Sequence, residues 1–380
     1  MNQYTWTPIG DPSPVPPPLP TEVSFTGERS EFFRLVARGA ALELVTVGFY
    51  RFWLVTDIRR HLWSNTVIDG DAAEYTGRGK ELLLGFLFAL AILVPIYLGY
   101  FLISVEAERF KSFASFPLIA AFYVFGQFAI YRARRYRLTR TVWRGVRFWM
   151  DGSGWAYAGR ATLWLLFAIL TLGFALPWRL AALERYKMRH SWCGDLQGDF
   201  EGQGWDFFKR VWWMLLLAPV AIVIFPLAPF LYAHYKAAEW RWWISGIRFG
   251  GVHLESTLPS NALTGLYWKV IGWSMLLSTG FGIFLGIVGA IVHAISGPST
   301  GANTLATSIP LAVASVIGYL ALVLAFSVVT RLYLSRDLWA RVLATTHVLG
   351  IEAAANVSAK GDLASALGEG FADGLDVAGF

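Results

Sequence analysis

Arginine is the residue type whose positions in this sequence most suggest a chemical function. Six arginines stand near glycines where helix-like sequence gives way to strand-like sequence: Arg140, Arg144, Arg147, Arg185, Arg241 and Arg248. A guanidinium carries a rigid fork of N–H donors that fits phosphate and carboxylate groups. These residues are therefore candidates for binding anionic lipid headgroups or another anionic ligand. The alternative is that they only orient the chain in a membrane and reach toward lipid phosphates in general.

Residues that commonly carry catalysis or metals show no matching pattern. The six histidines never take the paired spacing of a helical zinc site. Cys193 lies three residues after His190, but no third partner of a catalytic triad stands nearby. The glycines in the stretch 77–80 are too closely spaced for a phosphate-binding loop. A single cysteine also excludes an internal disulfide, so we expect no enzyme, no cofactor and no metal site.

Composition indicates a membrane protein. Of the 380 residues 56% are apolar and 15% are charged, whereas soluble domains carry about 25% charged residues. Five stretches approach or exceed the roughly 20 apolar residues that a membrane helix needs. They are 82–104, 116–131, 211–232, 268–295 and 309–330. The alternation typical of membrane strands is missing from them, which favours helices.

Short strand-like segments punctuated by glycine follow the basic helix ends. Residues 66–77 and 146–157 are examples, with β-branched or aromatic residues on both sides of a glycine turn. We therefore expect a polytopic α-helical membrane protein with short β-hairpins at its helix ends. The segments 30–62 and 160–190 are each interrupted, at Thr46-Val47-Gly48 and Thr171-Leu172-Gly173, and we expect broken helix pairs there.

The chain also resembles itself. Residues 46–79 match residues 171–204 at an offset of 125, and residues 131–148 match residues 232–249 at an offset of 101. We expect an internal duplication, with one repeat over 25–158 and another over 159–256. A C-terminal helix pair with a possible fifth hairpin would cover 257–350. A proline-rich tail over 1–24 and a flexible tail over 351–380 complete the expected domain organisation.

Basic residues give the expected orientation. Twenty of the 32 lysines and arginines cluster at five helix ends, which predicts that these ends and both termini are cytoplasmic. We therefore expect a multi-pass protein of the bacterial inner membrane. Nucleic acid is not an expected partner, because the basic residues follow helix ends. The expected partners are membrane lipids with anionic headgroups and, at the cytoplasmic face, another protein.

Two smaller patterns bear on packing and transport. Ser278, Gly282, Gly286, Gly289 and His293 share one helix face, which predicts a close helix contact within the chain or between protomers. The four spans over 82–104, 116–131, 211–232 and 309–330 lack Asp, Glu, Lys and Arg. Proton-coupled carriers usually keep an ionisable residue near mid-membrane, so we expect no proton transport. Glu43 lies deep in a repeat, and we expect Arg38 to neutralise it.

Several of these motifs together resemble one bacterial family. The motifs are Phe25-Thr26-Gly27, residues 46–53, Asp69-Gly70, Tyr75-Thr76-Gly77, Glu81-Leu82-Leu83 and residues 141–148. In this combination the chain resembles the YjgN family of inner-membrane proteins over about 25–350. The resemblance implies a location and an architecture, but no activity and no functional residue, because that family is a domain of unknown function. Ser245 stands where Arg144 stands in the earlier copy, so that arginine is not a fixed feature of the repeat.

Three functions of different kinds remain open, of which the third, a membrane enzyme, has little support in the sequence. The first is a scaffold, or a protein that binds lipid or a protein partner, without a catalytic site. The second is a transporter or channel for a small solute, which internal repeats and broken helices favour. The sequence leaves the ligand and the oligomeric state open.

Overall fold

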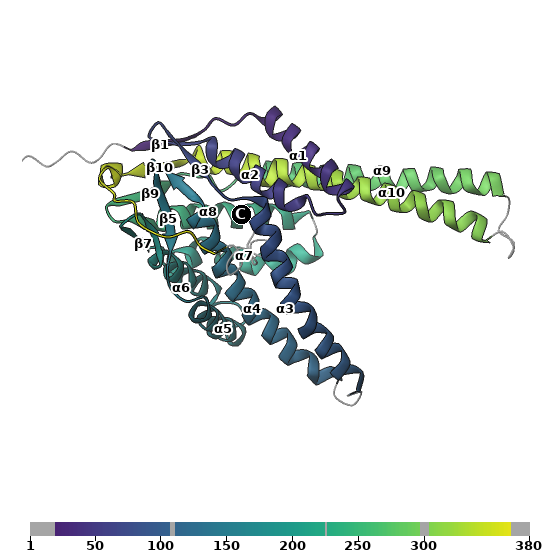
Figure 1. Ribbon diagram of the computed structural model, residues 1–380, viewed down its shortest axis with the longest axis horizontal. Coiled ribbons are helices and arrows are strands. Elements are labelled where there is room, and N and C mark those ends of the chain that lie inside the picture. Colours follow the sequence, from purple (N-terminus) through teal and green to yellow (C-terminus); the bar gives the residue numbers. More distant parts are fainter. Residues whose placement is uncertain (1–19, 107–110, 225, 297–303, 366–380) are drawn as a thin grey trace, which may run out of the picture.

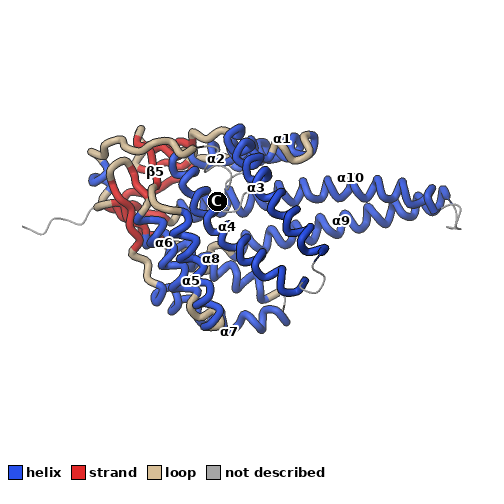
Figure 2. The backbone as a smooth tube through the Cα atoms, turned by 60° about the horizontal axis from the view of Figure 1, so that its bottom comes forward, coloured by secondary structure: helices blue, strands red, loops and turns tan. Residues whose placement is uncertain are grey.

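The computed structural model describes residues 20–106, 111–224, 226–296 and 304–365. It is mostly helical, and four helical segments are long and apolar enough to cross a membrane: Gly79–Leu102, Phe116–Thr139, Thr264–Ile295 and Ile309–Leu343. They form two helical hairpins that project away from a small β-structure and diverge from each other (Figures 1 and 2). The spans expected over 82–104, 116–131, 268–295 and 309–330 lie in these helices.

The chain consists of five consecutive strand–helix–helix–strand units, which we number in chain order. Unit 1 comprises β1 (Thr21–Phe25), α1 (Arg29–Val45), α2 (Arg51–Ser64) and β2 (Thr66–Ile68). Unit 2 comprises β3 (Asp71–Tyr75), α3 (Gly79–Glu106), α4 (Lys111–Thr139) and β4 (Thr141–Trp143). Unit 3 comprises β5 (Val146–Met150), α5 (Gly154–Leu170), α6 (Leu176–Arg189) and β6 (Ser191–Cys193).

The last two units keep the same order. Unit 4 comprises β7 (Leu196–Phe200), α7 (Gly204–Val223), α8 (Leu227–Gly246) and β8 (Ile247–Phe249). Unit 5 begins with β9 (Val252–Ser256), α9 (Thr264–Ser296) and α10 (Thr304–Thr330). It continues through the π-helix η2 (Arg331–Asp337) and α11 (Leu338–Leu343) to β10 (Thr346–Leu349). A short 3₁₀ helix, η3 (Ile351–Ala354), follows.

The strands form one closed antiparallel barrel in the order β1-β10-β9-β8-β7-β6-β5-β4-β3-β2. Figure 2 shows them gathered at one end of the molecule. Tight turns join neighbouring units, as where Asp69 and Gly70 both take positive φ between β2 and β3. The expected hairpins are therefore not separate, because each pairs with the next. At the place of the possible fifth hairpin, β10 pairs with β9 on one side and with β1, from the other end of the chain, on the other.

The two strands of each unit are held by the same backbone contact. The residue after the first strand donates its N–H to the carbonyl oxygen of the residue before the second strand. The five pairs are Thr26–Asn65 (2.9 Å), Thr76–Arg140 (2.8 Å), Asp151–His190 (3.0 Å), Glu201–Gly246 (2.9 Å) and Thr257–Thr345 (2.9 Å). This contact fixes where each helix pair leaves the barrel.

The two short helix pairs, α1/α2 and α5/α6, break at the residues that the sequence indicates. Val47 (φ +52°) and Gly48 (φ +87°) turn the chain in unit 1, and Leu172 and Gly173 do so in unit 3 at +51° and +89°. The Thr46 hydroxyl donates to the Leu42 carbonyl at 2.7 Å and accepts the Tyr50 N–H at 2.9 Å. Thr171 makes the equivalent two bonds.

The expected span over 211–232 is wrong. The structure divides it between α7 and α8, two antiparallel helices joined near Ile224 and Leu227. Helical hydrogen bonding ends at Ile224, whose φ and ψ of −100° and 79° are not helical. Hydropathy did not reveal this turn because the residues around it are as apolar as those of the helices. The division places both ends of unit 4 at the barrel.

The expected contact along the glycine face of residues 278–293 is not present within the described chain. No atom lies within 4 Å of a Cβ built at Gly282, Gly286 or Gly289. The close approach of α9 to α10 occurs instead at Gly318, where a Cβ would lie 2.6 Å from Phe284. The ring of Phe284 occupies the space that Gly318 leaves.

The partner expected for Glu43 is also wrong. Arg331, not Arg38, forms an ion pair with the Glu43 carboxylate at 3.2 Å. This pair joins α1 to the beginning of η2. It forms because α1 packs beside the end of α10, a proximity between distant parts of the chain that the sequence does not reveal.

The expected tails are shorter than proposed. Residues 1–19 and 366–380 lie outside the described residues. Residues 21–24 belong to β1, where Val23 is buried in the barrel, so the boundary at residue 24 is wrong. Residues 351–365 contact the barrel: the Ser358 hydroxyl donates to Asp195 at 2.7 Å, and the Ala364 carbonyl accepts a bond from Arg140.

Candidate site in the barrel

The barrel has an apolar interior and a polar exterior. Successive side chains of a strand point to opposite faces, so alternate residues line the interior. Val23, Trp143, Val252, Val348 and Ile351 form one buried apolar cluster. The alternate, outward positions include charged and polar residues: Glu22, Glu74, Arg147, Gln197, Asp199, Arg248 and Glu255. Membrane barrels place apolar residues outward, so this barrel is built for an aqueous surrounding.

The barrel contains a cavity of about 330 Å³. Eight strands enclose an interior that side chains can just fill, and a barrel widens as strands are added. Here ten strands of three to five residues supply few inward side chains for a wider interior. Nine of the ten strands line the cavity, together with Trp63, Trp339, Leu343, Ile351 and Ala354. The size of the cavity lies at the lower end of the ~300–1,000 Å³ typical of small-molecule pockets.

The few polar groups of the lining bond mainly to one another. The indole N–H of Trp63 donates to the Thr141 hydroxyl at 3.1 Å, and that of Trp339 donates to the Thr66 hydroxyl at 3.0 Å. The Trp63 and Trp339 rings stack with centroids 5.3 Å apart. Trp143 differs, because its buried indole N–H has no hydrogen-bond partner among the described residues. The cavity is thus lined almost entirely by apolar atoms.

Cys193 faces the same cavity from β6. The side chain is 6% exposed. Burial, together with the nearby Asp195 carboxylate, raises the pKa of its thiol to about 11. The thiol therefore stays protonated near neutral pH and is a poor nucleophile. Cys193 acts as part of the apolar lining, and as the single cysteine of the chain it is a unique chemical label for this space.

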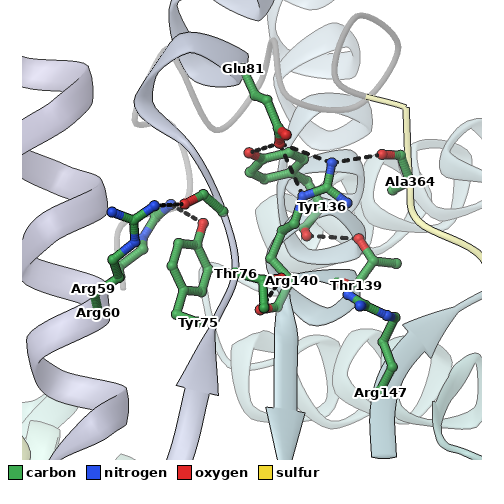
Figure 3. A network of polar contacts seen from close by, with 11 residues as sticks. Arg59, Arg60, Tyr75, Thr76, Glu81, Tyr136, Thr139, Arg140, Arg147 and Ala364 are labelled. Atoms are coloured by element: carbon green, nitrogen blue, oxygen red, sulfur yellow. Dashed lines mark hydrogen bonds and ion pairs between the residues drawn. The ribbon is translucent and has the colours of Figure 1, made fainter. Parts of the chain in front are cut away.

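The arginines predicted to bind anions have partners within the protein. Arg140, 5% exposed, forms an ion pair with Glu81 at 2.9 Å and donates to the Ala364 carbonyl at 3.2 Å (Figure 3). The Tyr136 hydroxyl donates to the same Glu81 carboxylate at 2.7 Å. In the same view, Arg147 donates to the Thr139 carbonyl at 2.6 Å. Arg140 and Arg147 therefore hold the end of α4 against the barrel.

Arg144 and Arg248 bind carboxylates on the barrel surface. Arg144 pairs with Asp69 at 2.7 Å and with Asp71, which joins the β4–β5 turn to the β2–β3 turn. Arg248 pairs with Glu201 at 2.9 Å. Both pairs are partly exposed, and such pairs contribute little to stability. They do, however, neutralise the charge that an anionic ligand would need.

Arg185 and Arg241 belong to a ring of contacts between successive units. Arg185 donates to the Gly202 carbonyl at 3.3 Å, and Arg241 donates to the Leu258 carbonyl at 3.5 Å. Arg60 makes the equivalent bond to Gly77 at 2.8 Å, visible in Figure 3, and Arg336 bonds to Gly27 at 2.6 Å. Four of the five junctions between units thus contain an arginine from one unit bound to the backbone of the next. The six predicted arginines are distributed around the barrel rather than brought into one site.

The match of residues 131–148 with residues 232–249, at an offset of 101, does not follow the register of the structure. It matches Gly145 with Gly246, but Gly145 has φ +74° in the β4–β5 turn, whereas Gly246 ends α8 against the Phe200 ring. The backbone contacts align Arg140 with Gly246, an offset of 246 − 140 = 106. The offset of 125 is consistent with the contacts, since Arg60 and Arg185 bind Gly77 and Gly202 alike.

A buried ionic cluster joins three units beside the barrel. The Glu184 carboxylate binds Lys187 and Arg134, at 3.1 Å for Arg134, and accepts the Trp243 indole N–H at 3.0 Å. Burial opposes ionisation of Glu184, but Lys187 and Arg134 hold its pKa at about 2. The carboxylate remains charged and ties α4, α6 and α8 together. All its groups are engaged, which suits a structural role.

The cavity was missed by sequence reasoning. Its signal was the alternation of apolar and polar residues, as in Val146-Arg147-Phe148 and Val252-His253-Leu254, where every second residue faces inward. That alternation predicts a buried face but not what the face packs against. Among the described residues, no group of three or more His, Cys, Asp or Glu is placed to hold a metal ion.

Comparison with known proteins gives one family. A family model described as a bacterial protein of unknown function, DUF898, matches residues 20–242. No curated protein and no solved structure matches the chain. The matched region covers units 1 to 3 and most of unit 4, more than half of the sequence. The chain therefore belongs to the DUF898 family of bacterial proteins of unknown function.

Proposed function

We propose that this protein is a non-enzymatic protein of the bacterial inner membrane that binds an acyl chain in its barrel. The observation that carries the proposal is the cavity of about 330 Å³ with apolar walls. Water makes few hydrogen bonds in an apolar cavity, so such cavities stay dry and bind apolar ligands.

An acyl chain suits the apolar lining of this cavity, which Ile68, Phe148 and Val348 help to form. Burying each CH₂ is favourable by about 0.8 kcal/mol relative to water. The barrel therefore offers a lipid tail an apolar environment outside the bilayer.

The arrangement in the membrane follows from the helices and the charges. Four membrane-length helices anchor the protein, and the polar exterior of the barrel favours a position outside the hydrocarbon. By the positive-inside rule, the basic residues at the barrel side favour a cytoplasmic position for it, and we propose that both termini lie on that side. We assign the equivalent contacts of units 1 and 3 to an internal duplication, and the chain to the YjgN branch of its family. A protein partner at the cytoplasmic face is part of the same proposal.

Mass spectrometry of the intact protein tests the proposal. The wild type should retain one acyl-bearing molecule under conditions that remove surrounding lipid. Ala73→Phe, which places a ring in the cavity, should retain none. Ala72→Phe makes the same change one residue earlier, at an exposed position that faces outward, and should retain the ligand. Equal retention by Ala73→Phe and wild type, or no retention by wild type, contradicts the proposal. Matching thermal unfolding of the two variants confirms that both are folded.

A further inference from the structure

A second cavity, of about 590 Å³, lies between α1 and α2, away from the barrel interior. The two helices approach each other closely at Gly39, where a Cβ would overlap the Leu54 side chain. From there the space between them extends along both helices toward Arg34 and Ser64. A wedge of this kind forms because only glycine permits such a close approach at one end.

The wedge has an excess of positive charge. Arg34, Arg38 and Arg60 line it, and Asp57 is the one carboxylate in its described lining. Arg60 is engaged, with Asp57 at 3.8 Å and the Gly77 carbonyl at 2.8 Å. Arg34 and Arg38, one helical turn apart, have no hydrogen bond or ion pair with any described residue, although the charge of Arg38 acts on the Asp57 carboxylate. The N–H donors of both guanidinium groups thus remain available to bind an anion.

The fold does not require these two arginines. In the equivalent helix pair, α5/α6, the offset of 125 places Gly159 and Leu163 at the positions of Arg34 and Arg38. The backbone turn, the threonine contacts and the arginine–glycine bond are the same in both pairs. The two units therefore share an architecture, and the free charges belong to unit 1 alone. A role in folding does not account for them.

The depth of the wedge fits a lipid headgroup. The turn beyond α1 exposes apolar side chains, with Val45 79% and Val47 88% exposed. Amphipathic segments bury such residues about 5–10 Å into the boundary of the acyl region. Arg38 lies seven residues before Val45, roughly 10 Å back along the helix. If the turn enters the bilayer, Arg38 reaches the level of the phosphates and Arg34 lies one helical turn farther out.

We propose that the wedge between α1 and α2 binds a phosphate group, with Arg34 and Arg38 as its ligands and Arg60 beside them. The group is that of an anionic lipid or of a free phosphate compound. This site is separate from the barrel cavity, and neither depends on the other.

Calorimetry on the full-length protein in detergent tests this site, with short-chain phosphatidylglycerol and inorganic phosphate as probes. Arg34→Gln/Arg38→Gln should weaken binding of the lipid at least about tenfold, since charge-assisted bonds are among the strongest hydrogen bonds. Lys209→Gln/Arg210→Gln removes the same charge at the start of α7 and should bind as wild type. Competition by inorganic phosphate assigns the site to a free phosphate compound. Lipid binding without such competition assigns it to the headgroup.

Unchanged binding of both probes in Arg34→Gln/Arg38→Gln overturns the proposal, as does an equal loss in the control variant. If the double variant does not fold, the same binding measurement is made on Arg38→Leu. A leucine should be tolerated there, because Leu163 occupies the equivalent position in α5. Ala73→Phe, which fills the barrel cavity, should leave binding at the wedge unchanged. Failure at one site therefore remains distinguishable from failure at the other.

Discussion

Arg336 donates a hydrogen bond of 2.6 Å to the backbone carbonyl of Gly27, and this bond closes the barrel between the last unit and the first. The two residues are 309 positions apart. The same guanidinium lies 2.9 Å from Asp337 and faces the Phe25 ring at 5.5 Å. The junction between β10 and β1 therefore depends on a side chain as well as on strand pairing.

Removing this bond should loosen the closure. Arg336→Gln should lower the free energy of unfolding by roughly 1.5–3 kcal/mol, the usual contribution of a hydrogen bond to a charged group. Arg78→Gln is the matched control, because the Arg78 side chain is exposed and bonds to no described residue. Thermal unfolding of both variants in the same detergent measures the difference. Equal unfolding temperatures would show that strand pairing alone closes the barrel.

The sequence predicted much of the helical part of this fold. Long apolar runs gave four of the spans, and Thr-Val-Gly and Thr-Leu-Gly marked the breaks after α1 and α5. Strands were predicted where glycine turns separate apolar residues. Their closure into a barrel was not, because strands of three to five residues carry little information about their neighbours. The pairing of β1 with β10 joins the two ends of the chain and leaves no local pattern.

The arginines show a similar limit on what can be predicted from the sequence. Their clustering was visible, but their partners were not, since carbonyl oxygens such as that of Gly202 carry no mark in the sequence. Arg34 and Arg38, which remain free, looked less notable than Arg140, which is engaged with Glu81. Charge pattern indicates where cations gather. The packing of units against each other decides which of them remain available.

Gly246 should not tolerate even a small side chain, because it packs against the Phe200 ring. Gly246→Ala places a methyl group against the Phe200 ring and should lower stability by about 1–3 kcal/mol, as overpacking does. Phe200→Leu in the same chain should recover part of that loss by making room. Gly282→Ala is the control, with open space around it. If Gly246→Ala unfolds at the wild-type temperature, the close packing at the end of α8 is not important for stability.

Glu43 distinguishes lipid binding from transport. Its carboxylate is paired with Arg331, and no proton pathway through the described spans is suggested by their apolar residues. Protein reconstituted in liposomes should leave an imposed pH gradient intact, with or without Glu43→Gln. A pH-sensitive dye inside the liposomes reports this. A leak that Glu43→Gln abolishes would favour a transporter instead.

The thiol of Cys193 should react according to its raised pKa. Only the thiolate reacts, so the rate of modification should rise about tenfold for each pH unit and level off near pH 11. Ala72→Cys in a Cys193→Ser background offers an outward thiol on the same barrel, whose rate should level off near its ordinary pKa of about 8.5. Stopped-flow modification by methyl methanethiosulfonate measures both. Identical profiles would mean that Cys193 is not buried.

Protection of Cys193 by an acyl chain tests the account most directly. In lipid nanodiscs, decanoate should slow the modification of Cys193 in a saturable way, because the chain occupies the cavity that the thiol lines. Ala72→Phe should behave in the same way, whereas Ala73→Phe should show no dependence on decanoate. A rate in the wild type that stays constant across the whole decanoate titration, or protection that persists in Ala73→Phe, would contradict acyl-chain binding in the barrel.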